Sequence, residues 1–153
     1  KVKISKNTNF QKLSLELSNL GSKMILKSLE LIENEQEKFI PQDERYASYA
    51  KKISKDEAKI DWKTSAEKIV AMINALHLSP GAWFNYEGSR IKILKAKEVE
   101  HKGRPGEIID KNFTIACEKK SIQILEIQKE GKQKMSINEY LRGNTLKIGY
   151  IID

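Results

Sequence analysis

The residues best suited to chemistry in this sequence are its lysines and arginines, which recur in three clusters. The first cluster lies before residue 56 and includes Lys38, Arg45, Lys51, Lys52 and Lys55. The second follows one predicted strand and its loop, and contains Arg90, Lys92, Lys95, Lys97, Lys102 and Arg104. The third contains Lys129, Lys132, Lys134 and Arg142. Because ammonium and guanidinium groups neutralise phosphates, a fold that gathers these clusters on one face would bind a polyanion such as nucleic acid.

The net charge favours this interpretation without deciding it. The 153 residues include 28 Lys and Arg against 21 Asp and Glu, a formal net charge of +7. A scattered Lys-rich surface that binds nothing fits the same charge, with Glu98, Glu100 and Glu130 neutralising part of it. Tyr46 and Tyr49 lie among the basic residues of the first cluster, where they fit either stacking on nucleic acid or a solvated connector.

The other reactive residue types predict neither catalysis nor metal binding. Zinc needs three or four His, Cys or carboxylate ligands, and His77 and His101 are far apart in the sequence. Cys117 lies in an apolar strand pattern, which indicates a small core residue in a reducing compartment. No glycine-rich loop has the phosphate-binding pattern. We therefore expect no catalytic residues, no cofactor-binding residues and no metal ligands in this chain.

Residues 1–54 predict a long helix and a linker. Apolar residues from Phe10 to Leu31 recur at three- and four-residue spacing, and Thr8 or Asn9 can cap the start of the helix. The surface that this apolar stripe would cover is missing from the chain. The following stretch is polar and contains the helix-breaking Pro41, so residues 37–54 predict a linker.

Residues 55–153 predict a second unit in which short helices accompany a small sheet. One helix would start near Ser54 and another at Thr64 or Ser65, the latter ending at Ser79-Pro80-Gly81. Strands are expected at 83–86, 90–99, 107–109, 113–117, 122–128 and 146–152. Ser136 and Glu139 form a capping-box pattern that predicts a further short helix. The fold class is mixed α and β: an N-terminal helix and linker, then an OB-like small β-barrel with short helices.

Several short motifs occur along the chain in a definite order and spacing. Pro41-Gln42-Asp43 with Ala47 to Ile53 lies in the predicted linker, and Ile60-Asp61-Trp62 follows it. Further on come a P-G-A-W turn at Pro80 to Trp83, a G-K-K-x-M-like stretch at Gly131 to Met135 and an F-L-x-G-like stretch at Tyr140 to Gly143. In their order and spacing these motifs resemble the methionyl-tRNA formyltransferase family, and the similarity covers essentially the whole chain. Asn74 departs from the pattern, because the family usually has arginine there.

The resemblance implies the C-terminal part of an enzyme whose catalytic Asn, His and Asp lie upstream of residue 1. Family enzymes transfer a formyl group from 10-formyltetrahydrofolate to methionine on initiator tRNA, in translation initiation. Residues 1–36 would then end the catalytic domain and residues 55–153 would form the tRNA-binding barrel, inactive alone. The expected partners are initiator methionyl-tRNA and the enzyme's own N-terminal catalytic domain, in a cytoplasmic monomer without membrane contact. The expected nucleic-acid contacts are Arg45, Lys51, Lys52, Arg90, Lys92, Lys95, Lys132, Lys134 and Arg142.

Two alternatives stay open at this point. The C-terminal domain of a related formyltransferase that acts on a sugar nucleotide would share the two-domain plan but would need a less continuous basic face. A non-catalytic protein-interaction module would account for the uncovered stripe of the first helix. An exposed apolar groove in place of a basic one would favour that module.

Overall fold

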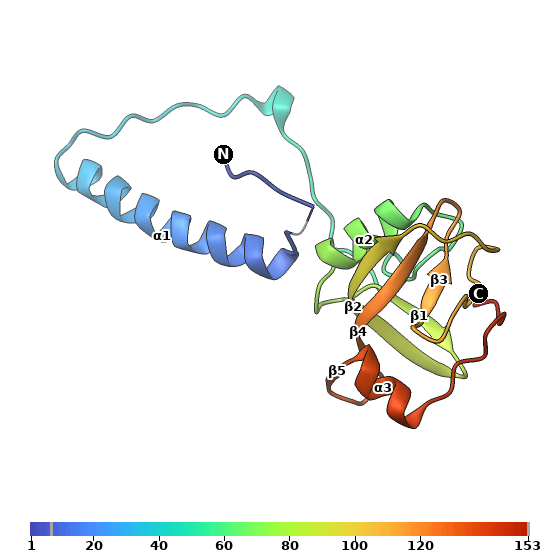
Figure 1. The fold of residues 1–153 in the computed structure, drawn as a ribbon. Helices are drawn as coiled ribbons and strands as arrows, with labels where there is room; N and C mark the ends of the chain where they lie inside the picture. The colour runs from blue at the N-terminus through green and yellow to red at the C-terminus, as the bar shows by residue number, and fades with distance from the viewer. Residues whose placement is uncertain (7, 153) are drawn as a thin grey trace.

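A long helix and a compact unit are joined by an extended segment in the computed structural model, which describes residues 1–6 and 8–152. Figure 1 shows the helix, α1 (Phe10–Glu33), to one side of the compact unit, with the segment after it running back toward that unit. The extended segment contains one short 3-10 helix, η1 (Glu44–Tyr46). The predicted linker is therefore extended over most of its length.

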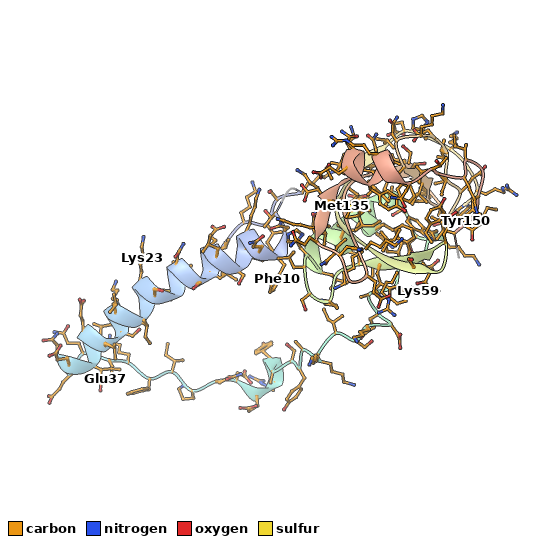
Figure 2. The ribbon with its side chains drawn as sticks, turned by 90° about the horizontal axis from the view of Figure 1, so that it is seen from below. Phe10, Lys23, Glu37, Lys59, Met135 and Tyr150 are labelled. Carbon is orange, nitrogen blue, oxygen red and sulfur yellow. The ribbon has the colours of Figure 1, made fainter. Side chains whose placement is uncertain are left out.

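Helix α1 is capped as the sequence predicted, but it packs against nothing along most of its length. The Asn9 side chain accepts a hydrogen bond from the Lys12 amide at 2.9 Å. No residue of α1, every one of which the structure describes, is buried, and Phe10 and Met24 are 56% and 61% exposed. Figure 2 shows the Phe10 end nearest to the compact unit and the side chains of α1 reaching into open space. The amphipathic stripe is thus uncovered in the described chain.

The compact unit is built on one curled antiparallel sheet. Its strands are β1 (Trp83–Tyr86), β2 (Ser89–Val99), β3 (Thr114–Ala116), β4 (Ser121–Lys129) and β5 (Lys134–Ser136). They are arranged in the order β1-β2-β4-β3, and β5 pairs with β4. Helix α2 (Ala66–Ala75) contacts β2 and β4, and α3 (Ile137–Gly143) contacts β4 and β5. The prediction of a mixed α and β fold with an OB-like small barrel and short helices is confirmed, and the barrel takes the form of a curled antiparallel sheet, a half-barrel.

The curl of the sheet encloses a core of isoleucine and aromatic side chains. Ile91, Ile93 and Ile124 are fully buried, and α2 adds Ile69 and Ile73 to the same cluster. Burying one such side chain contributes about 1.5–3 kcal/mol. Edge-to-face and stacked ring contacts run through the cluster, joining Trp62, Phe84, Phe113 and Tyr140. This core fixes the sheet whose outer surface carries the basic residues.

An irregularity in the pairing of β2 with β4 changes which residues of β2 face outward. Before it, Ile93 pairs with Ile127; after it, Ala96 pairs with Ile124, and the register shifts on either side of Lys95. Simple alternation from Ile93 would turn Lys95 toward the core. Instead Ala96 packs against the core and Lys95 stays exposed. The basic residues of β2 can therefore face outward on both sides of the irregularity.

The helix predicted near Ser54 is wrong, although its capping contacts form. Ser54 and Glu57 exchange hydrogen bonds between backbone amide and side chain at 2.7 and 3.2 Å. The chain then becomes extended, because Trp83 accepts from the Ile60 amide and donates to the Ala58 carbonyl. Backbone groups committed to Trp83 cannot also continue a helix, so only a turn remains.

Two predicted strands form only isolated bridges, and one short strand was missed. Residues 107–109 form isolated bridges, Glu107 with Ile151 and Ile108 with Ile115. Residues 146–152 turn at Gly149, whose φ of +81° interrupts an extended chain. The missed strand, β5, has three residues, too few to show an alternating pattern.

Candidate nucleic-acid interface

A groove of about 770 Å³ opens on the outer side of the sheet, where the extended segment reaches the compact unit. We call it the Trp83 groove. Its lining is Lys51, Lys52, Ile53, Lys55, Ser79, Pro80, Trp83, Arg90, Lys92, Gln128, Lys129, Glu130 and Gly131. Six of these thirteen residues are lysine or arginine, and one is acidic. The groove therefore concentrates positive charge from all three sequence clusters.

Backbone pairing brings these distant residues together. Lys92 of β2 pairs with Trp83 of β1 on one side and with Gln128 of β4 on the other. The indole Nε1 of Trp83 donates to the backbone carbonyl of Lys55 at 2.8 Å, which ties the end of the linker to the sheet. Residues from all three clusters are therefore held next to Trp83 or next to residues that pair with it.

The Ser79-Pro80-Gly81 turn leaves room for one of the basic side chains. Gly81 has a φ of +81°, and a Cβ built on it would lie 2.9 Å from Cδ of Lys92. The positive φ favours glycine here, and the missing Cβ leaves room for the Lys92 side chain, which would otherwise have to shift. Ser79 and Pro80 of this turn line the Trp83 groove.

The cations of the Trp83 groove form no ion pairs within the part of the chain that the structure describes. Among the residues that the structure describes, no carboxylate forms an ion pair with Lys51, Lys52, Lys55, Arg90, Lys92 or Lys129. Like charges collected in a concave surface raise the local concentration of an anionic ligand. The arrangement suits a chain of phosphates better than an apolar partner.

Four of the nine predicted contacts line the Trp83 groove, and the other five lie elsewhere. The four are Lys51, Lys52, Arg90 and Lys92. Lys95 and Lys134 line a second groove of about 940 Å³, together with Lys97 and the acidic Glu67, Glu98 and Glu126. That second groove has mixed charge, which favours a polyanion less strongly.

The remaining three predicted contacts are on separate elements. Arg45 of η1 forms a bidentate ion pair with Asp43, with Nη2 2.7 Å from Oδ2, and this hydrogen bonding holds the pKa of Asp43 below its ordinary value. Lys132 lies in the turn between β4 and β5, where its carbonyl accepts from Gln128. Arg142 is exposed in the last turn of α3. The structure therefore does not place these three in the Trp83 groove.

Trp83 is the groove residue that the sequence could not single out. Its ring lies beneath the Arg90 guanidinium, with Cζ 4.2 Å from the ring centroid. The P-G-A-W pattern marked a turn but not a contact with a residue seven positions later. Lys55 and Lys129 also line the groove, and the β2–β4 register explains Lys129, because Lys129 pairs with Ile91 between Arg90 and Lys92.

Two of the acidic residues expected to offset the second cluster have a different partner. Glu98 and Glu100 both pair with Lys120, at 2.5 and 2.7 Å. Hydrogen bonds from Lys120 to these carboxylates raise the pKa of its ammonium group. Glu98 and Glu100 therefore neutralise Lys120 of the β3–β4 turn, and among the described residues they form no ion pair with the second cluster.

The groups that could support catalysis are buried or isolated. Cys117 is 2% exposed, and burial raises the pKa of its thiol to about 12, which disfavours a thiolate nucleophile. Within residues 1–6 and 8–152, no three His, Cys, Asp or Glu side chains are grouped to hold a metal ion. In the same residues, no helix combines the length and apolar character that a membrane span requires.

Comparison with known proteins agrees with the motifs and the fold. Residues 52–145 match the family described as formyl transferase, C-terminal domain. The methionyl-tRNA formyltransferase of Pelagibacter ubique is 40% identical over 147 residues, covering 95% of this chain and 47% of that protein. That of Rickettsia bellii is 36% identical over 142 residues, covering 92% and 46%. The chain spans about half the length of these curated relatives.

The fold has solved counterparts as well. HypX from Aquifex aeolicus superposes with a TM-score of 0.73 over 92% of this chain and 27% of its own, at 20% identity. A second HypX structure gives a TM-score of 0.68 over 97% of this chain and 30% of its own. At such identity the similarity establishes the fold. The family model, the relatives and the fold agree, and the chain belongs to the formyl transferase C-terminal domain family.

Proposed function

We propose that this chain is the tRNA-holding C-terminal part of a methionyl-tRNA formyltransferase. The parent enzyme would transfer a formyl group from 10-formyltetrahydrofolate to methionyl initiator tRNA, in the cytoplasm, during translation initiation. The observation that carries the proposal is the Trp83 groove, in which six cations, none paired with an acid of residues 1–6 or 8–152, line one concave surface of a formyl transferase C-terminal domain.

The proposed division of the chain follows the sequence prediction. Residues 1–36 would complete a preceding catalytic domain, residues 37–54 would be the linker, and residues 55–153 would be the tRNA-binding barrel. The uncovered stripe of α1 supports the first assignment, because an amphipathic helix is stabilised mainly by what covers its apolar face. The extended, exposed backbone between α1 and Ala58 supports the second.

The contribution of this chain to the reaction would be positional. Formyl transfer needs a general base and stabilisation of an oxyanion, and we infer neither from the residues that the structure describes. Holding the body of the tRNA would raise the effective concentration of its aminoacylated end at a catalytic domain. The chain would therefore be inactive alone and would act through affinity and orientation.

The proposed contacts centre on Lys51, Lys52, Arg90 and Lys92, joined by Lys55 and Lys129. The other predicted contacts, Arg45, Lys95, Lys132, Lys134 and Arg142, would extend the interface beyond the Trp83 groove. Contacts to phosphate position a nucleic acid without reading its sequence. We expect salt-sensitive binding by the isolated chain, with a dissociation constant on the order of 10⁻⁴ to 10⁻⁶ M.

The test is a binding titration of the 153-residue chain with initiator tRNA across a salt series, with a sugar nucleotide as the comparison ligand. Steep weakening of tRNA binding as salt rises, with negligible binding of the sugar nucleotide, is the expected result. Absence of tRNA binding at low salt would contradict the proposal. Preference for the sugar nucleotide would instead favour a formyltransferase of that substrate class.

A further inference from the structure

Trp83 is fixed in place by packing and by hydrogen bonds. It is 8% exposed and packs with Ala58, Leu76 and Met72 in a small apolar cluster. Its backbone bonds to Ala58 and Ile60, and its Nε1 donates to Lys55 at 2.8 Å. The indole plane is therefore fixed on several sides before any ligand arrives.

Arg90 lies over this fixed ring and is half-buried. The guanidinium carbon is 4.2 Å from the ring centroid, well inside the range of a cation–π contact. The backbone of Arg90 is fixed too, because its carbonyl accepts from the Glu130 amide at 3.0 Å and its strand pairs with β1. Among the described residues no carboxylate pairs with this guanidinium. The N–H donors of the Arg90 guanidinium are therefore held in place, and no carboxylate among the described residues accepts from them.

We propose that Trp83 is a positioning residue that holds Arg90 ready to bind one backbone phosphate of the tRNA. This inference rests on the proposed function and assigns a task to one pair within the Trp83 groove. Ordering an arginine side chain costs conformational entropy, and a guanidinium already held over an indole loses less on binding. The indole also shields one side of the cation from water, which strengthens its interaction with an anion.

The chemistry at Arg90 fits a phosphate diester. A guanidinium offers a planar fork of N–H donors that matches two phosphate oxygens, whereas an ammonium offers a point charge. Lys92 and Lys129 line the same groove and would meet neighbouring phosphates of a continuous backbone. Arg90 would then be the geometric anchor, and the lysines would contribute charge.

The Trp83 hydrogen bond also joins this anchor to the linker. Because Trp83 Nε1 holds the Lys55 carbonyl, the backbone that carries Lys51 and Lys52 enters the groove at a fixed point. A variant that keeps an aromatic ring but lacks Nε1–H, Trp83→Phe, separates the two tasks. It should retain support for Arg90 while releasing the end of the linker.

The test compares charge-conserving variants of the full chain by titration with initiator tRNA. Arg90→Lys should weaken binding about fivefold with the salt dependence unchanged, because the charge stays and the held fork is lost. Trp83→Leu should weaken binding by a similar factor although it removes no charge. Trp83→Phe keeps a ring beneath Arg90, so it should weaken binding less than Trp83→Leu, and adding Arg90→Lys to it should still weaken binding about fivefold. Arg104→Lys is the matched control, since Arg104 pairs with Glu107 outside the groove, and should bind as wild type.

A fluorescence measurement gives a readout that a purely structural role would not change. In a Trp62→Phe background Trp83 is the single tryptophan, so its emission reports on the cation above it. Added tRNA should change this emission, and the change should be much smaller when Arg90→Lys is also present. Inorganic phosphate is the comparison probe, and it should change the emission only at far higher phosphate concentration.

The outcomes separate the inference from the proposed function. If the wild-type chain binds tRNA in a salt-dependent manner but Arg90→Lys and Trp83→Leu bind equally well, only the role of the pair is overturned. If the wild-type chain does not bind tRNA, both fail. An equal emission change with inorganic phosphate at matched phosphate concentration would also overturn the inference. If circular dichroism shows that Trp83→Leu does not fold, the binding of Arg90→Lys and the emission change on adding tRNA test the inference instead.

Discussion

The Ile152 amide donates to the carbonyl oxygen of Gly106 at 2.9 Å, which fastens the C-terminal segment to the loop before β3. Two further backbone bonds continue this contact, from Ile108 to Tyr150 and from Gly149 to Ile108. Gly106 has a φ of +85°, and a Cβ there would overlap the carbonyl oxygen of Ile152. The C-terminal segment is therefore held against the loop before β3 by backbone hydrogen bonds, and this close approach depends on glycine at position 106.

Replacing Gly106 by alanine should destabilise the compact unit more than the same change at Gly131. Both glycines have positive φ, so each alanine costs about 1–2 kcal/mol of backbone strain. Only Gly106→Ala adds a clash with backbone, because nothing lies within 4 Å of a Cβ at Gly131. Chemical denaturation of the two variants measures the difference. Equal losses would show that the contact with Ile152 is not tight in solution.

Cys117 should resist alkylation in the folded chain at pH 8. Its thiol is 2% exposed, and its pKa is raised to about 12 by burial, so thiolate is scarce at that pH. Iodoacetamide labelling followed by mass spectrometry should show slow modification in buffer and rapid modification in denaturant. Rapid labelling of the native chain would mean that the β3 region opens far more readily than the packed core suggests.

The start of α3 should lose stability in acid. Glu139 accepts from the Ser136 side chain and backbone at 2.7 Å, and these hydrogen bonds lower the pKa of its carboxyl below the ordinary 4.5. A lowered pKa means that the ionised form stabilises the fold above about pH 4.5, and this contribution is lost as pH falls through the folded-state value.

A comparison of Glu139→Gln with the wild-type chain checks this sign. The Tm gap between them should be largest near pH 7 and should narrow toward pH 3, where the wild-type carboxyl is protonated as well. Glu130→Gln is a control outside the capping box. A gap that widens on acidification would show that Glu139 does not act through its ionised form.

Two lysines on the same strand should differ in their effect on tRNA binding. Lys92 lines the Trp83 groove, whereas Lys97 lines the second groove, whose charge is mixed. We expect Lys92→Ala to reduce the slope of log affinity against log salt by about one, because one phosphate contact is removed. Lys97→Ala should leave the slope nearly unchanged. If both variants reduce the slope equally, the interface is a diffuse basic surface.

Local patterns were enough to predict much of this fold. The spacing of apolar residues predicted α1 and α2, the Ser136–Glu139 pair predicted α3, and short apolar stretches separated by turn residues predicted β1, β2 and β4. These features depend on contacts within a few residues, or on one buried face, and both are written directly in the sequence. The motifs also predicted the family.

The errors arose where long-range pairing competed with local preference. Ser54 and Glu57 make the contacts of a helix start, yet the following residues pair with Trp83 and no helix forms. Glu107 and Ile151 meet at a single bridge, because Gly149 turns the chain. Neither pairing can be read from a local pattern, since the partners lie more than twenty residues apart.

By itself, the sequence determined most of the helices and strands, the excess of positive charge and the family of this chain, because each depends on residue type and order. Only the tertiary structure decided which cations meet. The β2–β4 irregularity and the register around Trp83 gathered Lys51, Lys52, Arg90 and Lys92, and left Lys95 and Lys134 in another groove. The reason is that strand pairing and a single indole, not spacing along the chain, set the distances between charges.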